Sequence, residues 1–326
     1  MTIAFTICSV NYLAQARTLG DSLLKTNPDF TFIIGLVDRL ETKNLESEML
    51  PQFELLPVHT IGINDFEGLC GFYNITELNT AVKPFFIDYL YERYEKAQNV
   101  IYFDPDIIIF QPLNRLIDSL KSHDFVLTPH ICSSYNDDLW QNEEDLNNAG
   151  IYNLGFIATR RSIQTQEFIN WWKEKLRKEC LIDLCNGLFV DQHWVDFLPI
   201  FWDEVLVDKY LGYNVAYWNL HERPISKKEN QWFAGKDALL FFHFSGYSPK
   251  KPNEVSKYQN RIQFEKRPDI IPLFELYHQS LIKNGQAYYE PIPCDYIKPV
   301  KVERLVRLKK ILKKPFLILA DKIENN

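Results

Sequence analysis

The chain has 326 residues, of which 46% are hydrophobic and 24% charged, and it contains no uninterrupted apolar run of about 18 residues. This composition excludes fibrous, disordered and membrane-spanning proteins, and the length predicts two domains or one large α/β domain with an appendage. The formal charge is −7, and only 12 residues are glycine. An acidic, glycine-poor chain argues against nucleic-acid binding and against glycine-rich phosphate loops.

Strand-like apolar runs alternate with helical patterns, which is typical of an α/β domain on a largely parallel sheet. Strands are predicted at 3–10, 30–37, 100–103, 125–129, 151–159, 215–218 and 238–244. Helices are predicted at 12–25, 79–94 and 163–181, and the section before residue 79 is expected to be irregular. Residues 2–10 lack a basic leader and a cleavage pattern, so they predict a first strand and not a signal peptide.

The six cysteines have neither a CxxC pair nor the spacing of a disulfide framework. They are predicted to be buried thiols in a reducing compartment, and we expect a cytoplasmic protein. Their positions are Cys8, Cys70, Cys132, Cys180, Cys185 and Cys294.

The strongest local motif is Asp104-Pro105-Asp106, two carboxylates inside an otherwise apolar run from Ile101 to Phe110. Burying two uncompensated carboxylates costs several kcal/mol each, so a cation is expected beside them. A hard divalent ion with oxygen ligands would meet that need. The alternative is a surface turn at Asp-Pro-Asp.

A second motif is His243, which ends an apolar run and is followed by Gly246 and the pair Lys250-Lys251. Imidazole suits Mn²⁺ or a similar ion as a third ligand, and lysines suit phosphate oxygens. The alternative is a structural histidine at a strand end.

Taken together, the motifs resemble the GT-A glycosyltransferases, most closely the retaining family 8 of the glycogenin and lipopolysaccharide galactosyltransferase type. The resemblance covers about residues 1–255. It is carried, in order, by Tyr12 after the first strand, Asp104-x-Asp106, Asn153-x-Gly155, Asp191-Gln192 and His243-x-x-Gly246 with the lysines. It implies a single GT-A (Rossmann-like) nucleotide-sugar-binding domain at 1–260, a helical C-terminal extension at 261–297 and a basic tail at 298–326.

The resemblance also implies site residues. Asp104, Asp106 and His243 would hold Mn²⁺ or Mg²⁺ that bridges a nucleotide diphosphate. The family's late motif continues Lys-Pro-Trp, but this chain has one extra residue before Lys250-Lys251-Pro252 and Asn253 in place of Trp. Which lysine meets the phosphate therefore stays open.

Further donor contacts are implied, each with a competing structural interpretation. Tyr12 would stack on uracil or be a core tyrosine, and Asp38 would contact the nucleotide or be a solvated loop acid. Lys83 would face the donor where relatives carry Arg, or lie exposed on its helix. Asn153 and Gly155 would face the donor sugar or form a turn.

Asp191 would bind sugar hydroxyls, and Gln192 would lie near the anomeric carbon; the competing role of Asp191 is a helix cap. The aromatic run 213–223 either lines an acceptor groove or packs in the core. His193 and Asp196 receive no assigned role, although Asp191 and Asp196 are candidate bases for an inverting reaction.

The predicted function is metal-dependent transfer of a sugar from a nucleotide diphosphate sugar, most simply a UDP-sugar, to a glycan or lipid-linked glycan in cell-surface polysaccharide synthesis. Retention follows from the resemblance. The alternatives are an inverting GT-A enzyme, a sugar nucleotidyltransferase, and a non-catalytic carbohydrate-binding protein. The absence of a glycine-rich loop after the first strand argues against a sugar nucleotidyltransferase.

The tail is a further predicted contact. Residues 298–326 carry nine Lys and Arg against three Asp and Glu, a net +6 beside −13 for the rest. One helical face is apolar and its neighbour basic: Val302, Leu305, Leu308 and Leu312, then Arg304, Arg307, Lys310 and Lys314. Such a helix either binds an anionic membrane, which would place the enzyme at its inner face, or docks on the acidic body.

Overall fold

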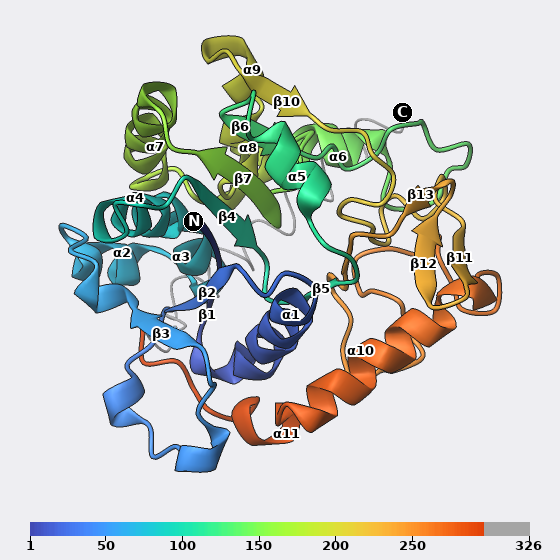
Figure 1. Ribbon diagram of the computed structural model, residues 1–326, viewed down its shortest axis with the longest axis horizontal. Coiled ribbons are helices and arrows are strands. Elements are labelled where there is room, and N and C mark those ends of the chain that lie inside the picture. Colours follow the sequence, from blue (N-terminus) through green and yellow to red (C-terminus); the bar gives the residue numbers. More distant parts are fainter. Residues whose placement is uncertain (297–326) are drawn as a thin grey trace, which may run out of the picture. The chain divides into compact units, whose positions relative to one another are not determined.

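A seven-stranded sheet forms the centre of residues 1–296, the part of the chain that the computed structural model describes (Figure 1). Its strands lie in the order β10 (Val205–Val207), β6 (Phe125–Leu127), β7 (Phe156–Arg160), β4 (Asn99–Phe103), β1 (Thr2–Cys8), β2 (Thr31–Leu36) and β3 (Glu54–Pro57). All neighbours are parallel except β7, which is antiparallel to β4 and β6. The predicted α/β class with a largely parallel sheet is confirmed.

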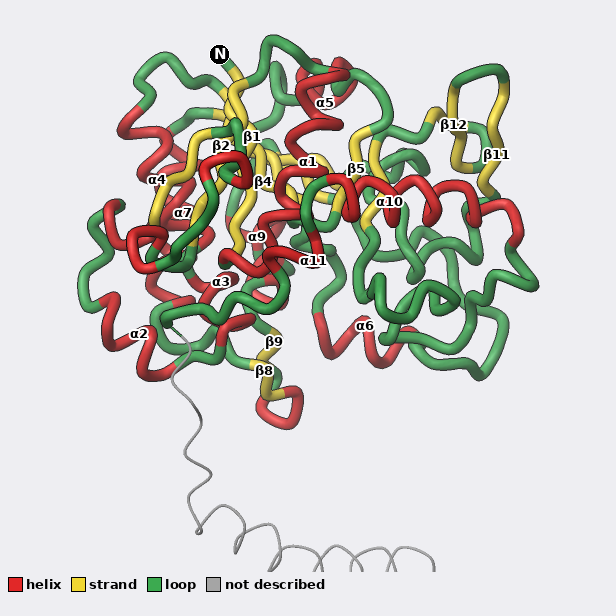
Figure 2. The backbone as a smooth tube through the Cα atoms, turned by 90° about the horizontal axis from the view of Figure 1, so that it is seen from below, coloured by secondary structure: helices red, strands yellow, loops and turns green. Residues whose placement is uncertain are grey.

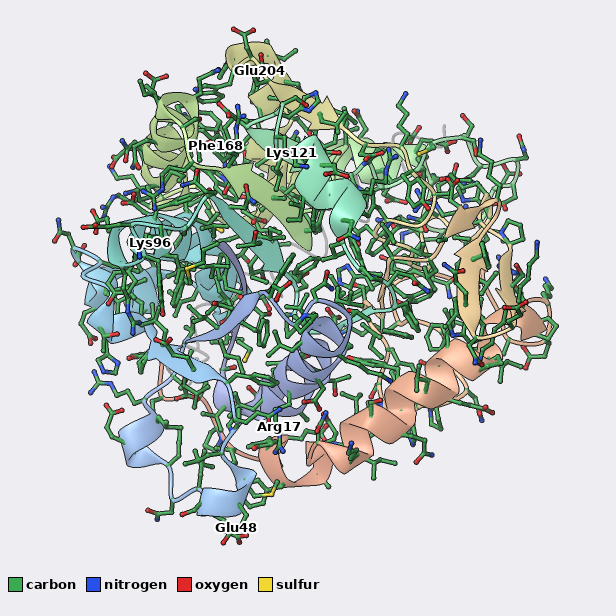
Figure 3. All side chains as sticks on the ribbon, in the orientation of Figure 1. Arg17, Glu48, Lys96, Lys121, Phe168 and Glu204 are labelled. Carbon is green, nitrogen blue, oxygen red and sulfur yellow. The ribbon has the colours of Figure 1, made fainter. Side chains whose placement is uncertain are left out.

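Strand β1 divides its side chains between two hydrophobic cores, because successive strand residues point to opposite faces. Ile3 and Phe5 join one core with α4 (Lys83–Arg93) and α7 (Ile163–Leu176), where Phe168 packs (Figure 3). Ala4 and Cys8 join the other core with α1 (Leu13–Thr26). Burial of each large apolar side chain stabilises the fold by about 1.5–3 kcal/mol.

The single helix predicted at 79–94 is instead two helices, α3 (Ile75–Ala81) and α4. Asn74 and Glu77 form a capping box that starts α3. Pro84 lies in the first turn of α4, where its missing N–H is tolerated and its fixed φ suits a helix start. The prediction followed the apolar periodicity and overlooked the break at Val82.

The strand predicted at 215–218 is wrong. Val215 makes only an isolated bridge with Phe242, and a turn follows. The Asn219 side chain stabilises this turn, since it accepts from the Ala216 N–H at 2.9 Å and donates to the Asn214 carbonyl at 3.0 Å. Side-chain hydrogen bonds of this kind compete with strand pairing.

Other predicted boundaries move. β7 begins at Phe156 and not at residue 151, α7 ends at Leu176 and not at 181, and the run 238–244 is broken into β13 (Asp237–Ala238) and β14 (Phe241–His243). The section expected to be irregular contains β3 and α2 (Phe66–Phe72).

Cys132 and Cys185 are exposed, so the expectation that all six thiols are buried is wrong.

Smaller elements surround the sheet. β5 (Ile107–Ile109) pairs antiparallel with β14, and β8 (Ile182–Asp183) with β9 (Leu188–Phe189). β12 (Gln231–Ala234) is the central strand of a three-stranded antiparallel sheet, between β11 (Ile225–Lys228) and β13. The remaining α-helices are α5 (Asn114–Ser119), α6 (Glu143–Ala149), α8 (Gln192–Val195), α9 (Leu198–Phe201), α10 (Ile271–Lys283) and α11 (Gln286–Tyr289). Short 3₁₀ turns are η1 (Val10–Tyr12), η2 (Leu40–Thr42), η3 (Ser47–Met49), η4 (Val58–Thr60), η5 (Leu184–Asn186) and η6 (Pro268–Ile270).

The last two helices pack on α1, as Figure 2 shows. Arg17 extends from α1 to the Tyr289 hydroxyl at 3.2 Å (Figure 3), and the Asn284 amide donates to Thr18 Oγ1 at 3.0 Å. Residues 261–296 therefore belong to the compact unit Met1–Tyr296. The predicted tail at 298–326 lies outside the described residues, and within 1–296 no helix has the length and hydropathy to cross a membrane.

Candidate functional site

The three predicted metal ligands, Asp104, Asp106 and His243, lie together at one end of the sheet. Asp104 and His243 are 139 positions apart in the sequence. Asp104 and Asp106 follow β4, and the antiparallel pairing of β14 with β5 sets His243 opposite Ile107. His243 Nε2 lies 3.0 Å from Asp106 Oδ1 and 3.6 Å from Asp104 Oδ2. All three ligand atoms lie within 4.8 Å of one another. Register and strand direction thus assemble the cluster.

The electrostatics of this cluster favour a cation. Burial raises the pKa of Asp104, although the charges of Lys83 and His243 work against that rise. Burial alone lowers the pKa of His243, but the carboxylates of Asp106 and Asp104 outweigh this effect and raise it. Two carboxylate oxygens and an imidazole nitrogen fit a divalent ion such as Mn²⁺.

Gly155 allows the cluster to close. Its carbonyl accepts the Asp104 N–H at 2.7 Å. A Cβ on Gly155 would overlap the His243 ring and lie 2.8 Å from both Asp104 Oδ2 and Asn153 Oδ1, closer than real Cβ contacts. The glycine is therefore needed for close approach, not for a turn.

Gly155→Ala should lower Mn²⁺ affinity by at least about tenfold, because overpacking costs about 1–3 kcal/mol and displaces two ligands. Calorimetric titration of Mn²⁺ measures the change. Gly62→Ala is the control, because it strains the backbone at φ +73° but meets open space around the added Cβ, and it should keep wild-type Mn²⁺ affinity. Wild-type Mn²⁺ affinity in Gly155→Ala would contradict this geometry.

Lys83 is buried beside the cluster and is not the exposed helix lysine of the competing interpretation. Its Nζ lies 2.5 Å from Asp191 Oδ2, and both side chains are 3% exposed. Nζ also donates to the Leu154 carbonyl at 2.8 Å and lies 4.1 Å from the Tyr102 ring centroid. The Tyr102 hydroxyl donates to Asp104 Oδ1 at 2.6 Å, which links the pair to the predicted metal ligands.

Asp191 precedes α8, but its carboxylate makes no cap hydrogen bond, so the capping interpretation is wrong. Burial raises the pKa of Asp191, and the Lys83 charge opposes this. Gln192 follows it, buried, with Nε2 donating to the Ala149 carbonyl at 2.7 Å. Asp191 is paired with Lys83, and both Lys83 and Gln192 are hydrogen-bonded to the backbone of Leu154. These contacts hold Asp191 and Gln192 on the same side of the sheet as Asp104.

Asn153 is held by a buried polar network. Its Oδ1 accepts from Gly155 N–H at 3.1 Å and from Asn214 Nδ2 at 3.0 Å. Its Nδ2 lies 3.2 Å from His130 Nε2, while His130 Nδ1 lies 3.1 Å from the Ile151 carbonyl. The carbonyl requires a donor, so His130 carries its proton on Nδ1 and accepts from Asn153.

The network predicts acid sensitivity, because burial lowers the pKa of His130 to about 4. Below pH 6.5 His130 is protonated in the unfolded chain but stays neutral in the folded protein. The free energy of unfolding therefore falls by roughly 1.4 kcal/mol for each pH unit of acidification, down to about pH 4. Denaturant unfolding from pH 7 to 4.5 checks this. His130→Gln should flatten the profile, and an equally steep profile in that variant would contradict the assignment.

Tyr12 ends η1 and is 46% exposed, so it is not a core tyrosine. Burial of the hydroxyl and the negative charge of Asp106 raise its pKa. Asp38 is fully buried and is not a solvated loop acid. It accepts from the Val10 N–H at 3.3 Å and pairs with Lys43 at 3.2 Å, so it stabilises the turn that carries Tyr12.

The loop after β14 carries the remaining predicted residues. Gly246 has φ +75°, and a Cβ there would overlap Ser256 and Tyr258. Lys250 pairs with Glu290 at 2.8 Å and Lys251 with Glu254 at 3.0 Å, both on the surface. Each lysine therefore already has a surface carboxylate as its partner.

The sequence patterns predict no site role for Tyr102 and His130, and Asn214 lies in the run 213–223, which is predicted to line an acceptor groove or to pack in the core. Tyr102 lies two residues before Asp104, so strand periodicity could have placed both on one face. His130 and Asn214 lie outside strands, and their contacts with Asn153 join segments more than 20 residues apart, which no local pattern reveals.

Comparisons with known proteins find sequence relatives and a structure with a similar fold. No protein-family profile matches the sequence. The uncharacterized protein YfnF of Bacillus subtilis is 25% identical over 285 residues, covering 86% of this chain and 92% of YfnF. YfnD of the same organism is 23% identical over 251 residues, covering 74% and 77%.

A crystal structure of the galactosyltransferase LgtC in complex with donor and acceptor sugar analogues is also similar. It has a TM-score of 0.51 and 16% identity, and the match covers 87% of this chain and 96% of LgtC. This chain shares the fold of LgtC.

Proposed function

We propose that this protein is a glycosyltransferase that transfers a sugar from a nucleotide diphosphate sugar to a glycan or lipid-linked glycan, with Mn²⁺ or Mg²⁺. The Asp104–Asp106–His243 cluster carries the proposal. The LgtC-like fold supports it, since in α/β sheets ligands bind at the carboxyl ends of strands, and Asp104 follows β4.

Each side chain would act through its contacts. A divalent ion held by Asp104, Asp106 and His243 would act as a Lewis acid that offsets charge on the departing diphosphate. Tyr12 would stack on the base, and Lys250 or Lys251 would contact phosphate oxygens by exchanging their surface carboxylate partners. We favour a UDP-sugar as donor.

For the reacting sugar, Asn153 and Asp191 would bind hydroxyls and Gln192 would lie near the anomeric carbon. The Asp191 ion pair with Lys83 supports retention in the manner of family 8, because Asp191 Oδ2 already accepts from an ammonium 2.5 Å away and is not a free base. An inverting reaction would need a free base, and Asp196 Oδ1 already accepts from the Ile151 N–H at 2.9 Å.

The proposal is tested by screening UDP-, GDP- and dTDP-sugars for binding and hydrolysis, with Mn²⁺ and with chelator. One nucleotide class should stabilise the protein and release its diphosphate only with the ion. No stabilisation and no release with any donor would reject the proposal.

We also propose that the tail at 298–326 holds the enzyme at an anionic inner membrane face in cell-surface polysaccharide synthesis. Its net charge of +6 supports this, at about 1 kcal/mol per charge near the surface. Deleting residues after Tyr296 should abolish salt-sensitive binding to phosphatidylserine vesicles and spare donor hydrolysis. A truncated protein that binds vesicles or unfolds would favour the docked helix instead.

A further inference from the structure

A pocket of about 300 Å³ lies outside the cluster, between α10 and the segment 247–264. This volume is at the lower end of the range for small-molecule sites, about 300 to 1,000 Å³. Figures 1 and 2 show α10 running from the β11–β12 region to α1. The helix lines the pocket with one face, at the helical spacing i, i+3, i+4, i+7 and i+8: Ile271, Phe274, Glu275, His278 and Gln279.

The walls of the pocket are aromatic. Phe274 is 4% exposed and packs edge to face with Phe264 at 5.1 Å and with Tyr247 at 5.5 Å between ring centroids. The Tyr247 hydroxyl is hydrogen-bonded to His278 Nδ1 at 2.8 Å, which fixes both rings. Rigid rings of this kind offer apolar faces without a large entropic cost on binding.

The polar groups of the pocket lie at its rim. Glu275, Gln279 and Asn253 are exposed there, and together they offer carboxylate and amide atoms that both donate and accept. Among the described lining residues none is lysine or arginine, and Glu275 repels anions. A phosphate or a nucleotide is therefore disfavoured, and a neutral ring with polar edges fits.

We propose that this pocket binds a neutral sugar unit, with its C–H face on the aromatic rings and its hydroxyls on Glu275, Gln279 and Asn253. The pocket also adjoins the loop with the two lysines. Tyr247 precedes Lys250 by three residues, and Pro252 and Asn253 directly follow Lys251, so both ends of the lysine loop line the pocket. A bound sugar thereby contacts the segment that carries both lysines.

Methyl β-D-galactopyranoside and methyl α-D-glucopyranoside are suitable probes, with glucose 1-phosphate as the anionic counterpart. Binding to the full-length protein is measured by ligand-observed NMR titration. At least one glycoside should bind, and its Kd should rise by at least about fivefold in both Glu275→Ala and Phe264→Ala. Leu276→Ala, on the same helix but outside the pocket lining, should leave the Kd unchanged. Glucose 1-phosphate should bind at least about fivefold more weakly than the glucoside.

The source of the sugar is then distinguished by transfer kinetics, a step that rests on the proposed function. A rise in KM for the glycoside as acceptor in Glu275→Ala, matching its rise in Kd, identifies a sugar of the acceptor; an unchanged KM identifies a separate glycan. Binding without any transfer upholds the pocket and counts against the proposed function. Absence of glycoside binding, or binding that neither pocket variant weakens, overturns the inference.

Discussion

Asp106→Asn should lower metal-dependent turnover by about a hundredfold or more while the protein stays folded. The change removes one charged oxygen ligand with almost no change in volume, and metal charge stabilisation is worth several kcal/mol. Asp104→Asn should have a similar effect. Turnover is measured as release of nucleotide diphosphate at saturating Mn²⁺, and folding by circular dichroism.

Asp118→Asn is the matched control, because Asp118 is an exposed acid on α5 that pairs with Lys121 at 2.6 Å. It should keep wild-type turnover. Wild-type turnover in Asp106→Asn and Asp104→Asn would remove both carboxylates from the site.

Lys83→Met should destabilise the fold by about 3–5 kcal/mol at neutral pH, because it leaves Asp191 buried without its cation. Burial already raises the pKa of Asp191, and loss of Lys83 raises it further. Folded Asp191 then holds its proton where the unfolded chain has lost it, so the deficit grows as pH rises. Urea unfolding at pH 5 and pH 8 measures both effects.

The double variant Lys83→Met/Asp191→Asn separates the charge from the packing. It should be more stable than Lys83→Met alone, since no unpaired charge stays buried. A double variant that is no more stable than the single one, or a deficit that shrinks at pH 8, would show that the pair does not carry the effect.

The sheet and the metal cluster could be predicted from the sequence because their signals are local sequence patterns. Asp104 and Asp106 interrupt an apolar strand, and His243 ends another, so strand pairing alone can join them. The α/β class follows from alternating periodicities in the same way. The sequence alone could not decide whether Lys83 is buried at the site or exposed, or whether Asp191 is a helix cap. Their 2.5 Å contact joins residues 108 positions apart, which no local pattern reveals.

The misses have physical causes too. The aromatic run near Trp218 looks like a strand, but the Asn219 side chain stabilises a turn there. The network from His130 through Asn153 to Asn214 depends on three loops meeting. The apolar periodicity continues through residues 79–94 and predicts one helix, but Pro84 marks the start of a second helix, α4.

We propose that Asp104, Asp106 and His243 would hold a divalent ion and thereby couple the binding of UDP to the binding of the metal. Calorimetric titration of UDP with saturating Mn²⁺ and with excess chelator tests it most directly, in wild type and in His243→Ala. We predict that Mn²⁺ tightens UDP binding at least about tenfold, that UDP tightens Mn²⁺ binding by the same factor, and that His243→Ala weakens both. Equal UDP affinity with Mn²⁺ and with chelator would contradict the claim.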